Sequence, residues 1–513
     1  MGSRRTLVAT VLVAGALAAA CGTRLPDEAF VRTSGGSATA STVAGGTATG
    51  PGASTPGATI APGSSPGVTA GASTSPGSGS SSVAGPGVTT APGGSGDNGG
   101  TAGPPAAQQG PNQASDEGVT ETTINIGSIV AENGVLGDAF APSARGLRAW
   151  VEYINHNGGI NGRTINLFTC DDREDRGRAL QCAQTLVEQD HVFALLGVNT
   201  RAFGGAAPYL AQVGLPVIGN PITNSMYRYG NEWSIYGDWY PRDGNEVGWH
   251  GQLMLQTGAY RWFKQNLGLT KAAVFAYDIP ESAQAADAFI QGLQLEGYEV
   301  TRYDVSFAAP SFDQPVADMQ RNGTQIIFDS MDDGANRRLC DAMDRRGFTV
   351  AAKVSTIVAM GASVGSDFPD ACRNSIYITG SSRPYTDTSV PAIADFNQAM
   401  AQYQPGVELH QWALESWAQG VMLRDYLTEA GAAPTRAGFN QWISALDGYT
   451  ADGIMVDVSY AQVDYNQPRL PECITIARWQ DSAPGGWIRV TDPYPLCYPD
   501  TFNYGSAVRE DGD

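Results

Sequence analysis

The chain is predicted to fold as an α/β protein with two lobes, each built on a doubly wound parallel sheet. The segment after residue 118 is roughly 400 residues long, which is enough for two lobes that each bury a core. Within it, short apolar runs typical of buried strands alternate with segments of helical periodicity. Strands that alternate with helices form parallel sheets through right-handed crossovers.

The first series of elements lies between residues 123 and 219. Its strands are expected at residues 123–129, 165–169, 192–196 and 215–219. Helices are expected between these strands. In the first helix, apolar residues recur at spacings of four and three and so share one face: Phe140, Ala144, Leu147, Val151 and Ile154. The next two helices are expected at residues 178–189 and 205–213. Gly158 and Gly159 end that first helix, because glycine accepts the left-handed conformation common at a helix C-terminus.

A second series follows a loop near residues 233–248 that is rich in aromatic residues and glycine. Its helices are expected at residues 253–267 and 283–296, and its strands at residues 272–277, 299–305, 325–331, 354–360 and 376–379. A last region follows, with a helix expected at residues 412–427 and a strand at residues 472–479. In open sheets of this kind, ligands bind outside the carboxyl ends of the strands. With two lobes, those ends can face each other across a cleft.

The N-terminus resembles a bacterial lipoprotein signal. Arg4 and Arg5 precede an apolar run at residues 7–17, and three alanines lead to Cys21. The leucine usual three residues before the cysteine lies one place further back, at Leu17. We expect a signal peptide at residues 1–20 and an acylated Cys21 on the extracytoplasmic face of the cell membrane. An ordinary secretory peptide is the alternative.

The next segment has the composition of a tether. Gly, Ser, Thr, Ala and Pro dominate residues 34–118, so this stretch cannot bury a core. We therefore expect residues 21–118 to form a lipidated N-terminus and a disordered linker, either a plain spacer or an O-glycosylated one. The net charge of −20 argues against nucleic acid as a partner, because phosphates would be repelled.

An even number of cysteines follows Cys21, which indicates disulfides in an exported protein. They fall into three sequential couples, and the simplest pairing is Cys170 with Cys182, Cys340 with Cys372, and Cys473 with Cys497. The alternative is a metal site, which we do not expect because there is no CxxC and the histidines are not grouped with the cysteines. No cofactor is expected either, since neither a P-loop nor a dinucleotide fingerprint is present.

Three segments together resemble type I periplasmic binding proteins of the leucine/isoleucine/valine-binding family, the substrate-binding lipoproteins of ABC importers. They are INHNGGINGRTINLFTCDD (154–172), AQTLVEQDHVFALLG (183–197) and GLPVIGNPITN (214–224). The resemblance implies a monomer with two lobes joined by a three-crossover hinge. The expected boundaries are 119–246 plus 380–455 for lobe 1, 247–379 plus 456–500 for lobe 2, and 501–513 for a tail.

The resemblance also implies ligand-binding residues in the first lobe. The loop after the third strand matches the family segment that holds a ligand carboxylate, which here is Asn199, Thr200 and Arg201. Thr223 matches a threonine that contacts an amino-acid head group, and Pro221 would offer its carbonyl in the same loop. A guanidinium that faces a cleft can bind a carboxylate or phosphate, so Arg201 is the strongest candidate for a ligand-binding residue.

Other candidates lie across the cleft and in the loop between the lobes. Ser282 stands where relatives often carry an aromatic residue. The family's acidic residue for an α-ammonium group would fall near Met360, where no carboxylate stands, and this departure argues against a simple amino acid. Tyr236, Trp239 and Tyr240 could instead stack on a flat ligand, or they could pack between the lobes.

A hydrolase is the enzymatic alternative. Residues 361–365 fit the G-x-S-x-G pattern around Ser363, and Asp395 and His410 complete the chain order of a triad. A nucleophile elbow needs a strand that runs straight into a helix, whereas residues 366–369 have the composition of a loop. We therefore expect a non-enzymatic protein.

The sequence as a whole predicts an extracytoplasmic solute-binding lipoprotein. It would capture a small molecule, such as an amino acid, an amide or a small organic acid, and deliver it to an ABC permease. A sensing lipoprotein that signals to a membrane partner is the alternative, because both functions use the same cleft.

Overall fold

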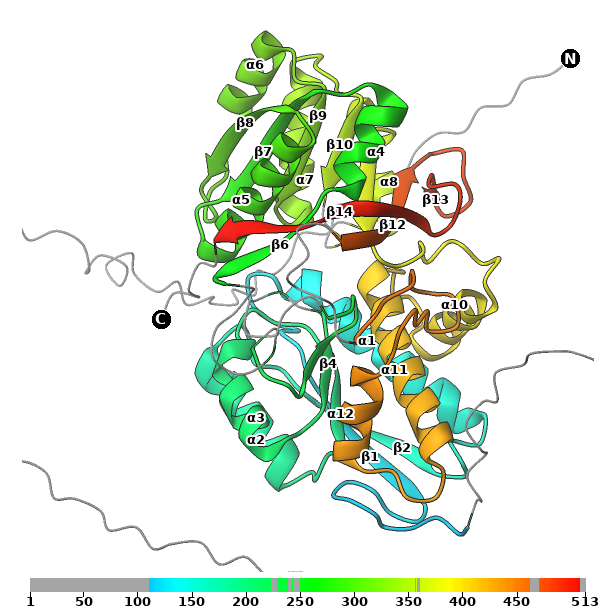
Figure 1. Ribbon diagram of the computed structural model, residues 1–513. Helices are drawn as coiled ribbons and strands as arrows, with labels where there is room; N and C mark the ends of the chain where they lie inside the picture. The colour runs from blue at the N-terminus through cyan, green and yellow to red at the C-terminus, as the bar shows by residue number, and fades with distance from the viewer. Residues whose placement is uncertain are drawn as a thin grey trace, which may run out of the picture. The chain divides into compact units, whose positions relative to one another are not determined.

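The computed structural model describes residues 110–220, 222, 228–238, 242, 250–355, 357, 360–461 and 470–507 (Figure 1). The expected signal peptide, Cys21 and most of the linker lie outside these residues, as do Pro221, Thr223 and Trp239. In this described part, no helix is long and apolar enough to cross a membrane.

The first sheet is parallel throughout, in the order β2-β1-β3-β4-β5. Its strands are β1 (Thr123–Ile129), β2 (Thr164–Cys170), β3 (Ala194–Val198), β4 (Val217–Gly219) and β5 (Glu232–Ser234). All five residues of β3 are buried, as expected for a central strand covered on both faces.

Helices from two distant parts of the chain pack with this sheet. The early ones are α1 (Gly137–His156), α2 (Arg176–Glu188) and α3 (Ala207–Val213), with a short 3-10 helix, η2 (Phe203–Gly205). The late ones are α10 (Pro391–Tyr403), α11 (Gln411–Ala430) and α12 (Arg436–Ser444). Helix α11 is buried on nearly all sides and contacts α1 and β3 (Figure 1). Gly146 of α1 contacts Ala413 of α11, and only glycine at residue 146 leaves room for the backbone of Ala413.

The second sheet is mixed, in the order β6-β14-β12-β11-β10-β9-β7-β8, with β13 paired to β12. Its strands are β6 (Gln252–Gln256), β7 (Lys271–Tyr277), β8 (Glu299–Val305), β9 (Ile326–Ser330), β10 (Ala352–Ser355), β11 (Ile376–Gly380), β12 (Leu470–Trp479), β13 (Trp487–Arg489) and β14 (Leu496–Ala507). Strands β7 to β11 pair in parallel, whereas the strands from the C-terminus pair antiparallel. Its helices are α4 (Gly258–Leu267), α5 (Pro280–Leu295), α6 (Asp313–Asn322), α7 (Asp333–Arg345), α8 (Val364–Asp367) and α9 (Asp370–Arg373).

The fold class predicted from the sequence is therefore confirmed. Each sheet, with its helices, forms one α/β lobe. The chain passes from one lobe to the other three times: between β5 and β6, between β11 and α10, and between α12 and β12. In Figure 1 the late helices α10, α11 and α12 accompany the first sheet, and the red C-terminal strand β14 joins the second.

Two predictions that concern β6 and β14 were wrong. Residues 252–256 form strand β6 rather than the start of a helix, and residues 501–507 belong to β14 rather than to a tail. The two segments pair with each other, with Phe502 opposite Gln256. Such pairing joins segments almost 250 residues apart, so a local helical pattern in one of them does not reveal it.

All three predicted disulfides are present. They join Cys170 to Cys182, Cys340 to Cys372, and Cys473 to Cys497. The first links β2 to α2 and the second links α7 to α9. Each therefore ties two neighbouring elements of one lobe together.

Of the three disulfides, Cys340–Cys372 is expected to contribute most to stability through loop closure. It closes a loop of 32 residues, against 12 for the first, and loop-closure entropy grows with loop length. The double change Cys340→Ala with Cys372→Ala should lower the free energy of unfolding by about 3–4 kcal/mol. Urea denaturation measures this loss. A smaller loss than that from Cys170→Ala with Cys182→Ala would contradict the loop-length argument.

Candidate functional site

A cavity of about 270 Å³ lies where the carboxyl ends of both sheets meet. Leu136, Arg201 and Tyr236 reach it from segments that follow β1, β3 and β5 of the first sheet. Tyr277 ends β7, and Phe307 follows β8 of the second sheet. This is the position at which open α/β sheets bind ligands, and it agrees with the cleft expected from the sequence.

The walls of the cavity are mainly apolar. Its aromatic residues are Phe140, Tyr236, Tyr277, Phe307 and Trp412. Its aliphatic residues are Leu136, Ala139, Ile222, Ile279, Ala285, Met331 and Ile357. A second cavity of about 390 Å³ shares Tyr236, Ala285 and Ile357 and continues toward Gln256, Phe289 and Asp329. A site with large apolar walls and a few polar groups is typical of small-molecule binding.

Arg201 lies at the cavity between two carboxylates. Its Nε and Nη2 both donate to Oε2 of Glu174, at 3.0 and 2.7 Å. Its Nη1 lies 3.9 Å from Oε2 of Glu281 at the start of α5, so this arginine connects a loop of the first lobe with a helix of the second. The guanidinium also lies over the ring of Phe307, 5.7 Å from its centroid.

Tyr277 and Asp332 form a polar pair on the second lobe. The tyrosine hydroxyl donates to Oδ2 of Asp332 at 2.5 Å, and Oδ1 of the same carboxylate accepts from the backbone N–H of Ala335. Asp332 is thus the N-cap of α7, a position where aspartate is a preferred residue. Burial and the adjacent carboxylate raise the pKa of Tyr277, so its hydroxyl keeps its proton and acts as a donor.

A buried carboxylate, Glu415 of α11, holds two residues that line the cavity, Asn220 and Tyr236. Its Oε2 accepts from the hydroxyl of Tyr236 at 2.7 Å and from Nδ2 of Asn220 at 2.6 Å, and its Oε1 accepts from Ser382 at 2.6 Å. Tyr236 follows β5 and Ser382 follows β11, where the chain leaves one lobe for the other. Glu415 therefore ties two of the three crossovers together.

The network around Glu415 makes the folded state more stable in mild acid. Burial raises the pKa of Glu415 to about 7, and it also raises the pKa of Glu472 in β12 to about 7. In the unfolded chain both would titrate near 4.5. Between these values the folded state holds protons that the unfolded state has released, so stability falls as the pH rises through this window and levels off above it.

Unfolding in urea at pH 5 and at pH 7.5 measures this effect. Each group should contribute about 2–3 kcal/mol of extra stability at the lower pH. Glu415→Gln should remove its share of the difference, because the amide can keep its oxygen toward Asn220 and Tyr236 while it donates to Ser382. An unchanged pH dependence in this variant would show that Glu415 is ionised in the folded state.

The comparisons with known proteins identify the family. A family model described as a periplasmic binding protein matches residues 123–484. The chain belongs to the periplasmic binding protein family. Its resemblance to type I members of the leucine-binding kind is thereby confirmed. Proteins of this family bind solutes between two lobes, as the position of the cavity indicates here. None of the curated proteins compared with the chain matches it.

Solved structures share the fold at low sequence identity. A fatty acid ABC transporter substrate-binding protein from Thermomonospora curvata has a TM-score of 0.59 at 16% identity, over 74% of this chain and 95% of that one. A leucine-binding protein from Thermotoga maritima has a TM-score of 0.56 at 15% identity, over 72% and 99%. A solute-binding protein of an ABC transporter from Rhodopseudomonas palustris BisB5, in complex with 3,4-dihydroxybenzoic acid, has a TM-score of 0.55 at 14% identity, over 75% and 98%.

Of the binding residues proposed from the sequence, three line the cavity of this family member: Arg201, Tyr236 and Ser282. The hydroxyl of Ser282 accepts from the N–H of Tyr277 and donates to the carbonyl of Ser330, so it links two segments that line the cavity. Asn199 and Thr200 do not line either cavity described above. Asn199 donates to Ser143, and Thr200 accepts from the N–H of Ala202, so both are engaged within the first lobe.

The residues of the hydrolase alternative are used structurally. Nδ1 of His410 accepts from the N–H of Trp412 as the N-cap of α11, so it cannot donate to an aspartate. Asp395 accepts from the hydroxyl of Tyr153. Ser363 is the N-cap residue of the short helix α8, so residues 366 and 367 are helical rather than part of the loop expected from the sequence. Among the described residues, no group of three or more His, Cys, Asp or Glu side chains is placed to hold a metal ion.

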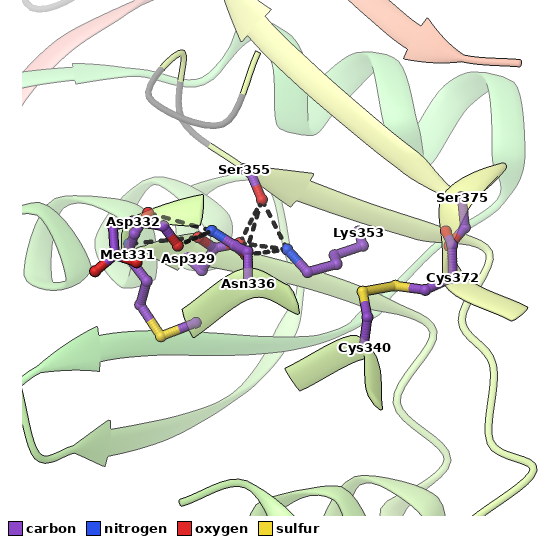
Figure 2. Close-up of polar contacts among 9 residues, drawn as sticks. All are labelled: Asp329, Met331, Asp332, Asn336, Cys340, Lys353, Ser355, Cys372 and Ser375. Carbon is purple, nitrogen blue, oxygen red and sulfur yellow. Dashed lines mark hydrogen bonds and ion pairs between the residues drawn. A yellow bond between two sulfur atoms is a disulfide. The ribbon is translucent and has the colours of Figure 1, made fainter. Parts of the chain in front are cut away.

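A buried polar cluster in the second lobe was not foreseen. Lys353 and Asp329 are both 0% exposed and form an ion pair at 3.0 Å. Figure 2 shows Asn336 and Ser355 turned toward the same ammonium group, with the Cys340–Cys372 disulfide beside it. Asp329 and Ser355 also line the second cavity, so this cluster fixes the ends of β9 and β10 below it.

Sequence reasoning also missed Asn220, Glu281, Trp412 and Glu415. Asn220 lies within the GLPVIGNPITN segment and follows a strand, which was a usable signal. Glu415 and Trp412 belong to α11, which enters the first lobe almost 200 residues after β4. No local pattern shows that this helix faces the ligand loops.

Proposed function

We propose that this protein is a lipid-anchored, extracytoplasmic solute-binding protein that takes a small molecule into the cavity between its lobes and delivers it to an ABC importer. The observation that supports this proposal best is the cavity itself. It lies at the carboxyl ends of both sheets, receives side chains from both lobes, and is walled mainly by aromatic and aliphatic groups.

Ligand capture would work through closure of the lobes. Arg201 of the first lobe and Glu281 of the second face each other at 3.9 Å across the cavity, so movement of the lobes would change the distance between these two charges. Tyr236 lies at a crossover and lines both cavities, which places it to sense closure. Closure exposes a composite surface that a membrane permease can recognise, and no bond chemistry is required.

The ligand would have a substantial apolar part. Tyr277, Phe307, Phe140 and Trp412 present ring surfaces, and rings of this kind bind flat or branched apolar groups. Arg201, Tyr236 and Ser282 are the polar residues that we assign to ligand binding or to its support. Pro221, Thr223 and Trp239, together with Asn199 and Thr200, stay candidates from the family resemblance.

Acylation of Cys21 would hold the protein at the membrane, with residues 21–118 as the tether. The change Cys21→Ser should release the protein from the membrane fraction into the medium or the soluble extracytoplasmic fraction. Cell fractionation with detection by antibody tests this directly. Retention of the variant in the membrane would contradict lipid anchoring.

Thermal unfolding against a panel of solutes tests the binding function. The full chain, stripped of co-purified ligand by partial unfolding, would be heated with amino acids, sugars, short peptides, amides, amines and aromatic acids. A ligand present at 100 times its Kd should stabilise the folded state by about 2.7 kcal/mol. A rise in Tm with one chemical class supports the proposal, and no rise with any class would argue against solute capture.

A further inference from the structure

We infer that the ligand of the 270 Å³ cavity is an amine, with a positively charged nitrogen on an apolar body and no free carboxylate. The inference rests on the proposed function and narrows it to a substrate class. Its basis is the sign and the pairing of the charged groups that line the cavity.

The cationic group at the cavity is already neutralised. Two nitrogen atoms of Arg201 donate to Oε2 of Glu174, and the third faces Oε2 of Glu281. A ligand carboxylate bound to this guanidinium would be a third anion beside the carboxylates of Glu174 and Glu281. Like charges at such distances repel, and more strongly in a site with apolar walls than in water. Arg201 is thus a poor receptor for an acid.

One anionic group at the cavity lacks a hydrogen-bond donor. Oε2 of Glu281 is sheltered from solvent and has no hydrogen-bond partner within the described structure. Asp332, which also lines the cavity, accepts the hydroxyl of Tyr277 with one oxygen and caps α7 with the other. A buried acceptor without a donor is costly, and an ammonium group would supply the missing donor through a charge-assisted hydrogen bond.

The apolar walls complete a site for an amine. The rings of Tyr277 and Phe307 lie edge to face at 5.0 Å, and those of Phe140 and Trp412 lie 5.5 Å apart. Ring faces attract cations as well as apolar groups. The unsatisfied oxygen of Glu281, together with several aromatic rings around the cavity, favours a cation over an anion of the same size.

Three probes with the same phenyl group and a similar length separate the possibilities: 2-phenylethylamine, 2-phenylethanol and phenylacetate. Calorimetric titration into the full chain carrying Cys21→Ser, which lacks the expected acylation site, would measure each Kd. The amine should bind about tenfold more tightly than the alcohol, and phenylacetate should bind most weakly. An equal or higher affinity for phenylacetate would overturn the inference while the proposed function stands.

The change Glu281→Gln provides a second, independent readout. It should weaken the amine about tenfold, leave the alcohol unchanged and strengthen phenylacetate, because Arg201 then faces one carboxylate fewer. A purely structural role would weaken all three probes alike, and that result would overturn the inference. The matched control is Glu299→Gln, which makes the same charge change on a 74% exposed side chain paired with Lys271 at the other end of its sheet.

Absence of binding by all three probes would also overturn the amine assignment. The solute panel then decides the proposed function separately. Stabilisation by another class would preserve a solute-binding protein with a different ligand, whereas no stabilisation by any class would remove both.

Discussion

Replacement of Lys353 by methionine is expected to lower the free energy of unfolding by about 3–5 kcal/mol. Lys353 and Asp329 are fully buried, and the ammonium group also contacts Asn336 and Ser355. Methionine fills a similar volume but leaves the Asp329 carboxylate in the interior without its counter-charge. Breaking a buried pair from one side is costly because the remaining charge is poorly solvated. Urea denaturation measures the loss.

The matched control is Lys271→Met, where the lysine is 47% exposed and pairs with an exposed glutamate. That change should cost less than about 1 kcal/mol. Adding Asp329→Leu to Lys353→Met should recover part of the lost stability, since both charges are then absent. If the single change proved as mild as the control, the ion pair would not be the group that holds β9 to β10.

The change Gly146→Ala is expected to destabilise the first lobe by about 3 kcal/mol. In an exposed helix, alanine in place of glycine stabilises by about 1 kcal/mol, so the expected sign is reversed. A Cβ at this position of α1 would lie 2.0 Å from the carbonyl oxygen of Ala413 in α11. The two helices would have to separate, and both carry residues that line the cavity, Phe140 and Trp412.

Gly177→Ala in α2 is the control. A Cβ there would meet only the side chain of Asp175, at 3.2 Å, which can adjust. Thermal unfolding and ligand titration of both variants measure the two effects. Gly146→Ala should lower Tm and weaken binding, whereas the control should change neither appreciably. A stabilised Gly146→Ala variant would mean that α1 and α11 can move apart at little cost.

The elements predicted correctly share strong local signals. The first helix was recognised from Phe140, Ala144 and Leu147, which are all buried on one face. The disulfides follow from cysteines that are close in sequence. Strand β6 was not predicted, because its pairing partner, β14, lies at the other end of the chain. Local pattern and long-range pairing disagreed there, and the pairing prevailed.

The candidate site divides in the same way. Arg201 lies in the segment after β3 and Ser282 in the first turn of α5 after β7, and parallel topology alone brings such segments to one edge of a sheet. Their partners could not be inferred from the sequence. Arg201 is neutralised by Glu174, and the hydroxyl of Ser282 is engaged by backbone groups of Tyr277 and Ser330. The sequence shows which residue types follow the strands, but it does not show whether their side chains are already paired with other groups of the protein.

The sequence by itself determined the fold class, the family, the disulfide pairs and the edge of each sheet at which a ligand would bind. All of these follow from periodicity, spacing and motifs within short stretches of chain. Only the tertiary structure decided the chemistry of the cavity. Glu415 and Trp412 arrive on α11 after the second crossover, and Glu281 reaches Arg201 from the opposite lobe. Charge balance and burial depend on contacts between residues far apart in sequence, and local pattern does not encode them.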